Sequence, residues 1–394
     1  MNIAMNNCYD VAVCGGGFAG ISAALAAARE GKRVVLFEKQ FLLGGLGTAG
    51  LVTIYLPICD GLGRQVSFGI AEELLRLSIT YGAEARYPEN WLDGVGTRTE
   101  TDKRFSVQYN GQVFAILAEQ ALLDAGVEIM YGSYVVDVKM NGDKIGSLFV
   151  ENKSGRTEYN IGAVVDATGD CDVAKFSGAP TKLFEPGNVL AAWYYYTDES
   201  GYKLQQVGAS DTPDDEQNGK GRAPLVDRRF SGIDGKELSE MTCLSHQNTL
   251  KAWLKKRESN PNAVISTLAT IPQIRMTRRI VGEYELTYAE EHKYFADSVG
   301  MIANWRKRGP VYEVPFRTLY NSQVKNLIVA GRCTSTDDML WDAMRVIPCC
   351  AVTGQAAGTA AAMTEDFSTL DVSALQARLK SAGVVLHESD IIGG

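Results

Sequence analysis

The N-terminal part of the chain alternates short apolar runs with glycine. Tyr9–Cys14 is apolar and leads into the glycine-rich segment 15–20, and Ile21–Arg29 is then rich in Ala and Leu. Gly31 ends this run, and Val34–Phe37 is apolar again. Short apolar runs bounded by glycine are typical of buried strands, and a longer Ala/Leu-rich run is typical of a helix. The pattern predicts a strand, a tight turn, a helix and a second strand.

Three stretches in the middle of the chain predict an antiparallel meander. Glu128–Val138, Ile145–Asn152 and Thr157–Ile161 are rich in β-branched and aromatic residues, and Asn-Gly and Ser-Gly pairs separate them. Runs of this kind joined by such pairs are typical of strands connected by tight turns.

Later segments predict further buried strands and helices. The runs 163–170 (AVVDATGD) and 326–332 (NLIVAGR) each pass from β-branched residues into small ones, as a buried strand does before a turn. Helices are predicted at Leu238–Arg257 and at the small-residue run Gly354–Ala360. The segment Thr197–Glu240 is polar, which predicts either a mobile lid or a solvated surface loop.

Composition narrows the function. The chain has 394 residues, 45% of them hydrophobic and 22% charged, and a formal net charge of −8. An acidic balance argues against a protein that grips the phosphate backbone of nucleic acid. The apolar runs Ala19–Ala28 and Gly354–Met363 are too short to span a bilayer. We expect a cytoplasmic protein with neither a nucleic-acid nor a membrane partner.

The eight cysteines and three histidines show no C-x-x-C spacing and no Cys/His cluster. A structural zinc or iron–sulfur site normally needs such a spacing or cluster, so we expect no bound metal. We expect the cysteines to be free thiols in a reducing compartment. The adjacent Cys349 and Cys350 leave two interpretations open: a redox-active pair or, as for most such neighbours, two packed thiols.

The glycine turn matches the G-x-G-x-x-G dinucleotide fingerprint in its full strand–turn–helix–strand context. Gly15 allows the tight turn, Gly17 lets the backbone approach a pyrophosphate, and Gly20 lets the helix pack on the strand. Glu38, at the end of the second strand, can accept hydrogen bonds from ribose hydroxyls and disfavours a 2′-phosphate. A second match at 45–50 follows no clear strand and opens no amphipathic helix, so it predicts a loop.

Several segments carry a resemblance to a known family: GGGFAG, LLGGLGTAGLVT, LPICDGLGRQVSFGIAEELL, VVDATGD, IPQIRMTRRIVGEYELT and NLIVAGRCTSTDDMLWDAMRVIPCCAVTGQAAGTAAA. With them the chain resembles the bacterial FAD-dependent oxidoreductases with a glutathione-reductase-type FAD-binding fold. That group is distantly similar to fumarate reductase flavoproteins. The resemblance covers a little over half of the chain, and only its FAD-site motifs are specific.

The resemblance implies an α/β fold: a Rossmann-like, three-layer FAD/NAD(P)-binding fold with an inserted α+β substrate lobe. The expected domains are residues 1–183 and 325–394 for the two parts of the FAD-binding domain, and 184–324 for the substrate or cap domain. The same resemblance implies a set of FAD contacts spread over these two parts. They are Gly15, Gly17, Phe18, Ala19, Gly20, Glu38, Lys39, Gly45, Thr48, Val136, Ala167, Thr168, Gly169, Gly331, Arg332 and Arg345.

The chain departs from the family pattern at two places. Arg332 follows the glycine of the last strand, where an acidic residue is common, and Asp337 and Asp338 stand where the subfamily often has a histidine. With no histidine near the flavin motifs, we expect FAD to be bound non-covalently.

The candidate catalytic residues are Arg275, Arg278 and Asp337. Arg275 and Arg278 lie among apolar neighbours, where an arginine can bind a carboxylate or stabilise negative charge. Structural ion pairs with Glu283, Glu285 or Glu290, or a contact between domains, are the alternatives. Asp337 can orient a substrate or act as a base, or else cap a helix. His246 sits in a predicted helix and is more simply a core or surface residue.

We therefore expect an FAD-dependent oxidoreductase that catalyses two-electron oxidation or reduction of a small metabolite. The alternatives are a flavoprotein electron-transfer subunit with a partner redox protein, an NAD-dependent dehydrogenase, and a protein that retains FAD without turnover. A small-molecule substrate and an external electron carrier are the expected partners, and a homo-oligomer stays open.

Overall fold

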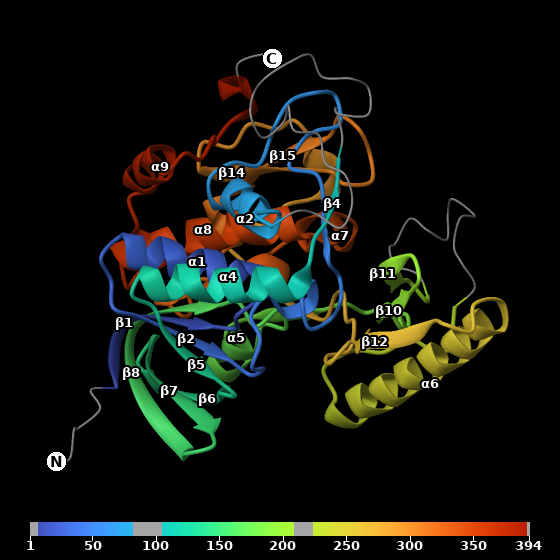
Figure 1. The fold of residues 1–394 in the computed structure, drawn as a ribbon. Coiled ribbons are helices and arrows are strands. Elements are labelled where there is room, and N and C mark those ends of the chain that lie inside the picture. The colour runs from blue at the N-terminus through green and yellow to red at the C-terminus, as the bar shows by residue number, and fades with distance from the viewer. Residues whose placement is uncertain (1–6, 82–104, 209–223, 392–394) are drawn as a thin grey trace.

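The computed structural model describes residues 7–81, 105–208 and 224–391. A seven-stranded sheet lies at its centre, in the order β5-β2-β1-β8-β7-β6 with β16 also paired to β8 (Figure 1). Its strands are β1 (Cys8–Cys14), β2 (Val34–Glu38), β5 (Glu128–Tyr131), β6 (Tyr134–Asn141), β7 (Lys144–Asn152), β8 (Gly155–Asp166) and β16 (Leu327–Val329). Strands β5, β2, β1, β8 and β16 run parallel, whereas β6 and β7 are antiparallel to their neighbours.

Strand β8 belongs to two layers at once. Its first half pairs antiparallel with β7, and its second half pairs parallel with β1 and β16. Side chains of β1 alternate between the two sides, as a strand requires. Val11 and Val13 join the core under the helices, whereas Ala12 and Cys14 join the core under the meander β6-β7-β8. The result is the expected three-layer α/β fold of helices, parallel sheet and meander.

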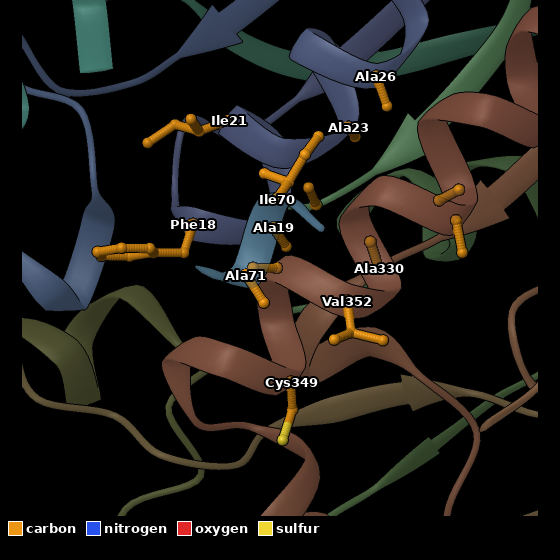
Figure 2. Packing of buried hydrophobic residues seen from close by; sticks show 14 of the residues in the cluster. Phe18, Ala19, Ile21, Ala23, Ala26, Ile70, Ala71, Ala330, Cys349 and Val352 are labelled. Atoms are coloured by element: carbon orange, nitrogen blue, oxygen red, sulfur yellow. The ribbon is translucent and has the colours of Figure 1, made fainter. Parts of the chain in front are cut away.

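Helices α1 (Phe18–Arg29), α4 (Gly111–Asp124) and α8 (Ile347–Met363) form the helical layer. Small residues allow α1 and α8 to cross in close contact: a Cβ on Gly354 would overlap the carbonyl oxygen of Ala19, and one on Gly358 that of Ala23. Figure 2 shows this part of the core, with Ala19 on α1 and Val352 on α8. The close crossing brings the middle of α8 beside the start of α1.

A smaller lobe stands apart from the sheet in Figure 1 and consists of β10 (Tyr194–Asp198), β11 (Gly201–Gln205), β12 (Val264–Leu268) and α6 (Gly235–Ser259). The strands pair in the antiparallel order β11-β10-β12. Helix α6 begins after Asp234, whose carboxylate accepts hydrogen bonds from the amides of Lys236 and Glu237. With strands and a helix, this lobe has the secondary structure of the expected α+β insertion.

The predicted segment 184–324 also holds β14 (Ser298–Ala303) and β15 (Val311–Pro315), a two-stranded sheet that contacts α8. The boundaries 1–183, 184–324 and 325–394 therefore stay a prediction. The remaining helices and strands are α2 (Ile70–Ser78), α5 (Asp172–Ser177), α7 (Asp338–Met344), α9 (Val372–Ser381), β3 (Ile54–Tyr55), β4 (Val107–Gln108), β9 (Thr181–Leu183) and β13 (Arg278–Ile280).

Most of the predicted elements are confirmed, the helix predicted at Gly354–Ala360 extends over Ile347–Met363, and the division into strands was wrong at two places. The stretch Glu128–Val138 is two strands, because Gly132 turns the chain with φ +57° between them. As a consequence β5 joins the parallel edge and only β6 joins the meander. The runs Thr157–Ile161 and 163–170 were predicted as separate strands, but β8 is continuous as far as Asp166.

The polar stretch Thr197–Glu240 is described only in part, since residues 209–223 lie outside the described ranges. Its described ends belong to β10, β11 and α6, and a lid there stays a prediction. Within the ranges described, no single helix is long and apolar enough to cross a membrane; α7 and α8 meet that criterion only as a pair, bent by 88°.

Candidate functional site

The turn between β1 and α1 is built by glycine. Gly15 has φ +103°, and a Cβ there would lie 2.5 Å from the carbonyl oxygen of Ala167. A Cβ on Gly20 would overlap the carbonyl oxygen of Gly15. Gly17 differs, because nothing lies within 4 Å of its Cβ position. Gly15 and Gly20 are thus required by packing, whereas Gly17 faces open space.

The first turn of α1 presents backbone groups to that space. Gly17 is the residue before the helix and offers no side-chain cap, so the first amides of α1 lack a side-chain acceptor. Phe18 and Ala19 follow it and are buried. The Phe18 ring stacks on Phe114 at 4.5 Å and anchors the helix start against α4. An uncapped helix start of this kind suits an anion.

Glu38 ends β2 beside the turn and is 5% exposed. Its two carboxylate oxygens accept hydrogen bonds from the amides of Gly16 and Gln40, each at 2.7 Å. Burial raises the pKa of this carboxyl, and the two amides oppose that shift. Each oxygen keeps a lone pair for a further donor, as a ribose hydroxyl would be. The neighbouring Lys39 is exposed.

The loop at 44–50 folds back onto the turn. Gly44 and Gly17 form a parallel bridge, and the amide of Gly44 donates to the carbonyl of Gly16 at 2.8 Å. Gly45 has φ +55°, and its Cβ position is 3.3 Å from the Cα of Gly17. The hydroxyl of Thr48 is turned inward and donates to the carbonyl of Leu43. The second glycine-rich match is thus a loop packed on the first, as predicted.

Three more predicted contacts lie on the sheet side. The register of β6 against β7 shifts between Val135 and Asp137, so Val136 sits at a bulge. Ala167 approaches Gly15, as described above. The Thr168 hydroxyl donates to the buried carboxylate of Asp166 at 2.6 Å. Of these three, Ala167 and Thr168 lie against Gly15 of the turn.

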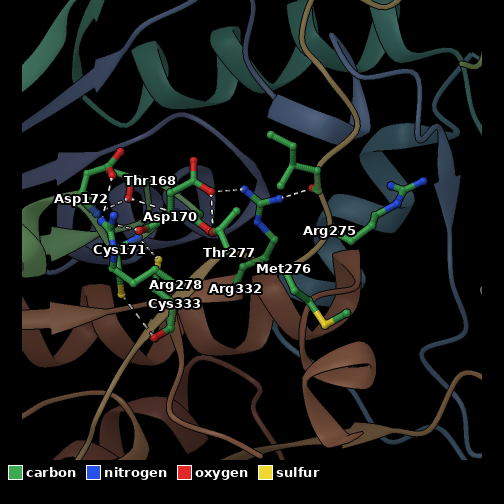
Figure 3. Close-up of polar contacts among 12 residues, drawn as sticks. Thr168, Asp170, Cys171, Asp172, Arg275, Met276, Thr277, Arg278, Arg332 and Cys333 are labelled. Atoms are coloured by element: carbon green, nitrogen blue, oxygen red, sulfur yellow. Dashed lines mark hydrogen bonds and ion pairs between the residues drawn. The ribbon is translucent and has the colours of Figure 1, made fainter. Parts of the chain in front are cut away.

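Gly331 joins the last strand to the start of α1. It has φ +68°, its amide donates to the hydroxyl of Thr353 at 2.9 Å, and its Cβ position is 2.9 Å from the Cβ of Ala19. The next residue, Arg332, pairs with Asp170 at 3.1 Å and donates to the carbonyl of Ile274. Figure 3 shows this contact.

Gly169, at φ +81°, makes room for the Arg332 guanidinium: a Cβ on it would lie 2.5 Å from Nη2 of Arg332. The Arg332 side chain is therefore held beside Asp170.

Arg275 lies in the extended segment before β13. Asn188 fixes its backbone, since the Asn188 side-chain oxygen accepts from the amides of Arg275 at 2.8 Å and Met276 at 2.9 Å. The Arg275 side chain is 4% exposed, and its Nη2 donates to Oε1 of Gln273 at 3.0 Å. Its Nε has no hydrogen-bond partner among the described residues. In Figure 3 it points away from the network around Asp170.

The surroundings of Arg275 are cationic. Burial, together with repulsion from Arg345 and Arg332, lowers the pKa of Arg275 to about 9, while Asp342 opposes the shift. Arg345 ends α7 and pairs with Asp342, and its Nε is likewise buried without a partner among the described residues. The structure thus brings together Arg275, Arg332 and Arg345 from distant parts of the sequence.

The other two candidate catalytic residues lie elsewhere and make structural contacts. Arg278 donates to the carbonyl of Asp170 at 3.2 Å and pairs with Asp172 at 3.4 Å. Asp337 caps α7 by accepting from the amide of Leu340 at 2.7 Å, and also accepts from that of Tyr288 at 2.9 Å. Structural roles of this kind are the alternatives that the sequence left open, and catalysis by either residue stays a prediction.

The thiols and His246 also have defined places. All eight cysteines are free. Burial raises the pKa of Cys349 and raises that of Cys350 to about 12, which favours the unreactive thiol. His246 lies on α6 and lines a small pocket with Trp193 and Gln273.

Comparison with known proteins assigns the chain to a family. A family model described as FAD dependent oxidoreductase matches residues 10–189 and 195–379. The chain belongs to the FAD-dependent oxidoreductase family. The match covers both the glycine turn and the segment that carries Arg275.

Individual relatives of this FAD-dependent oxidoreductase are distant. Thioredoxin reductase from Ureaplasma parvum is 35% identical over 77 residues, 20% of this chain and 25% of that protein. Vinyl phenol reductase from Lactiplantibacillus plantarum is 27% identical over 195 residues, 43% of this chain and 39% of that protein. The matches thus span a quarter and about two fifths of these relatives' lengths.

A solved structure shares the fold. The geranylgeranyl bacteriochlorophyll reductase-like protein from Thermoplasma acidophilum superimposes with a TM-score of 0.51 at 15% identity, over 96% of this chain and 84% of that one. Likeness at this identity shows the fold alone.

Sequence reasoning missed three residues of the site in this FAD-dependent oxidoreductase. Gln273 links Arg275 to the loop at 44–50, because its Nε2 donates to the carbonyl of Gly50 at 2.6 Å. Trp193 lies with its ring 5.3 Å from the Arg275 guanidinium. Asp342 forms ion pairs with Arg345 and, at 2.7 Å, with Arg306. The spacing Gln-Ile-Arg in an extended segment, which puts Gln273 and Arg275 on one side, was the one local signal.

Proposed function

We propose that the chain binds one FAD non-covalently and uses it for two-electron oxidation or reduction of a small-molecule substrate. The observation that carries the proposal is the meeting of three glycine segments at the start of α1. The turn at Gly15–Gly20, the loop at Gly44–Gly45 and Gly331 all approach one another there. They leave space at Gly17 in front of an uncapped helix start. Such a backbone cradle suits a pyrophosphate.

Each part of FAD has residues that fit it. The turn and the first amides of α1, at Phe18 and Ala19, would hold the pyrophosphate. Glu38 would accept from the ribose hydroxyls with its remaining lone pairs. Val136 would meet the adenine with its backbone, because the bulge takes it out of the regular β6–β7 register.

The remaining predicted contacts divide into two groups. Gly45 and Gly331 offer backbone close to Gly17 and Ala19, and fit the ribityl–pyrophosphate part. Ala167, Thr168 and Gly169 follow β8 and would pass the adenosine half. In contrast, the side chains of Thr48, Arg332 and Arg345 are already bound within the protein, so their contacts with FAD would use the backbone or require side-chain movement.

Non-covalent binding is supported by where the candidate nucleophiles lie. His292 pairs with Glu388 at 2.8 Å and His387 with Glu313 at 3.0 Å, away from the glycine turn. The thiols of Cys349 and Cys350 have raised pKa values because they are buried. The two histidines are bound to carboxylates and the two thiols are held in the protonated form, so none of these groups is activated for attachment to a flavin.

Bound FAD supplies the two-electron acceptor or donor, and the protein must position the substrate and exclude water. The segment 271–277, which follows β12 of the smaller lobe, would position the substrate. Gln273 ties that segment to Gly50, and Tyr195 on β10 hydrogen-bonds to Thr53 at 2.5 Å. These two links join the segment 271–277 and the lobe to Gly50, in the loop packed on the glycine turn, and to Thr53, shortly after that loop. Arg275 lies between them and the pocket as the group that would bind substrate.

Anaerobic reduction tests the proposal. The flavin absorbance of the purified protein is followed while a panel of small metabolites is added in the absence of oxygen. We expect at least one substrate class to bleach the flavin to the two-electron reduced spectrum, with turnover once an external electron carrier is added. Reduction only by a co-purifying redox protein would favour the electron-transfer subunit. Retained flavin that no substrate, carrier or partner reduces would contradict an oxidoreductase role.

A further inference from the structure

Arg275, in the extended segment before β13, is a buried positive charge without a counterion among the described residues. Arg275 is 4% exposed and makes no ion pair among the described residues. Its Nη2 donates a hydrogen bond to the neutral amide of Gln273. Burying a guanidinium without an anion is costly, because water no longer solvates its charge. The site therefore suits an anionic ligand.

The nearby carboxylates are already engaged by other cations. Asp342 pairs with Arg345 and with Arg306 at 2.7 Å. Asp170 pairs with Arg332 at 3.1 Å and accepts from the Thr277 hydroxyl at 2.8 Å. The protein thus provides no further carboxylate for Arg275 in the part of the chain that the structure describes.

Other unsatisfied donors lie beside Arg275. The Nε of Arg345 and the indole Nε1 of Trp193 are buried, and neither has a hydrogen-bond partner among the described residues. The guanidinium of Arg275 lies 5.3 Å from the centre of the Trp193 ring. N–H donors from two arginines and one indole match the several lone pairs of a carboxylate.

The position of this cluster points to the substrate as the source of the anion. Trp193 and Gln273 both contact Arg275, and both line the pocket that His246 also lines. Gln273 at the same time binds the carbonyl of Gly50, in the loop packed on the glycine turn. Arg275 therefore lies between the pocket of the smaller lobe and the loop next to the proposed cofactor site.

We propose that Arg275, supported by Arg345, binds the carboxylate of the substrate, so that this oxidoreductase acts on a small carboxylic acid. The inference rests on the proposed function and names its substrate class. Arg275 would hold the carboxylate with its Nε and the adjoining Nη in the two-point geometry that guanidinium favours. Trp193 and Gln273 would set the direction of the rest of the molecule.

Calorimetric titration of the oxidised, FAD-containing protein tests this directly. Acetate, propionate and benzoate are each compared with their amides, which have a similar shape but no charge. We expect saturable binding of at least one acid, no binding of its amide, and a matching change in the flavin absorbance. Arg275→Gln should weaken binding of the acid about tenfold or more, since the variant loses the charge that strengthens these hydrogen bonds. Arg275→Lys should restore part of the affinity.

A matched control and two contrary outcomes make the test decisive. Arg228→Gln removes an exposed arginine of the same lobe, paired with Glu240 at 2.9 Å, and should leave acid binding unchanged. Absence of binding by all three acids, or equal binding in Arg275→Gln, would overturn the proposal. Loss of FAD from Arg275→Gln would show that the anion belongs to the cofactor, which also overturns it. Calorimetry detects binding without flavin chemistry, so a failed reduction assay remains a separate result.

Discussion

A Cβ on Gly20 would overlap the carbonyl oxygen of Gly15, so these two residues fix how closely α1 packs on the end of β1. Three residues earlier, Gly17 has an ordinary extended backbone, with φ −71° and ψ −179°, and open space at its Cβ position. The fingerprint thus contains glycines of two kinds. One kind is required by the fold, and the other keeps space free for a ligand.

Alanine at these two positions should separate the two roles. We expect Gly20→Ala to destabilise the protein by about 1–3 kcal/mol or more, because a methyl group is forced against backbone. Gly17→Ala should leave the thermal unfolding of the FAD-free protein unchanged and lower FAD affinity at least several-fold. Unfolding of the apoprotein and FAD content per chain measure the two effects. Equal FAD content in Gly17→Ala and the parent would contradict the ligand role of this glycine.

Replacement of Glu38 by Gln should weaken FAD binding. The carboxylate accepts from the amides of Gly16 and Gln40, and would accept from ribose as well. A carboxamide turns an N–H group toward one of these donors, so we expect about a tenfold loss of FAD affinity, measured by fluorescence titration of the apoprotein. Glu73→Gln, which removes an exposed partner of Arg29, should have no such effect. Unchanged affinity in Glu38→Gln would rule out the ribose contact.

Binding of a carboxylate should depend on pH through Arg275. Burial and the charges of Arg345 and Arg332 lower the pKa of Arg275 to about 9, while Asp342 opposes the shift. Only the protonated guanidinium attracts an acid, so the Kd for benzoate should be constant near pH 7–8 and rise about tenfold per pH unit above about 9.

The same shift affects stability. Because the folded-state pKa is lowered, the buried charge costs stability below about pH 9, and that cost disappears at higher pH. A bound acid should therefore raise the Tm most at neutral pH. A pH profile identical in Arg275→Gln would contradict this assignment.

Substitutions at Asp337 distinguish a cap from a catalytic base. The carboxylate caps α7 through the amide of Leu340. Asn also caps helices well, whereas Ala does not, so we expect Asp337→Ala to lose about 1 kcal/mol of stability and Asp337→Asn to lose little. Denaturant unfolding measures this. If Asp337→Asn keeps its stability and loses turnover completely, Asp337 acts as a base in addition to capping α7.

The sequence pattern was sufficient to predict those elements whose structure is determined by residues close together in the chain. Strand β1, helix α1 and strand β2 follow from apolar runs and glycines that are adjacent in the chain. The break between β5 and β6 was missed because Gly132 interrupts a run that stays apolar on both sides. Its positive φ becomes evident only when Phe41, whose ring lies 2.5 Å from the Cβ position of Gly132, is placed beside it.

The arginine cluster depends on contacts that no local pattern shows. Arg278 and Asp172, or Arg332 and Asp170, are far apart in sequence and meet only after β8, β13 and β16 have packed. Arg278 and Arg332 each form an ion pair with an aspartate, whereas Arg275 forms none with the described residues. Which arginine in the segment 271–287 keeps its charge unmatched was therefore beyond the sequence, although the segment itself was identified.

The most direct test of the central claim is the absorbance spectrum of the purified protein before and after acid precipitation. We predict the two bands of oxidised flavin in the native protein and release of all the yellow colour into the supernatant, where it is identified as FAD. Colour that stays in the pellet would contradict non-covalent binding. A colourless protein that takes up no added FAD would contradict the proposed cofactor site at the glycine turn.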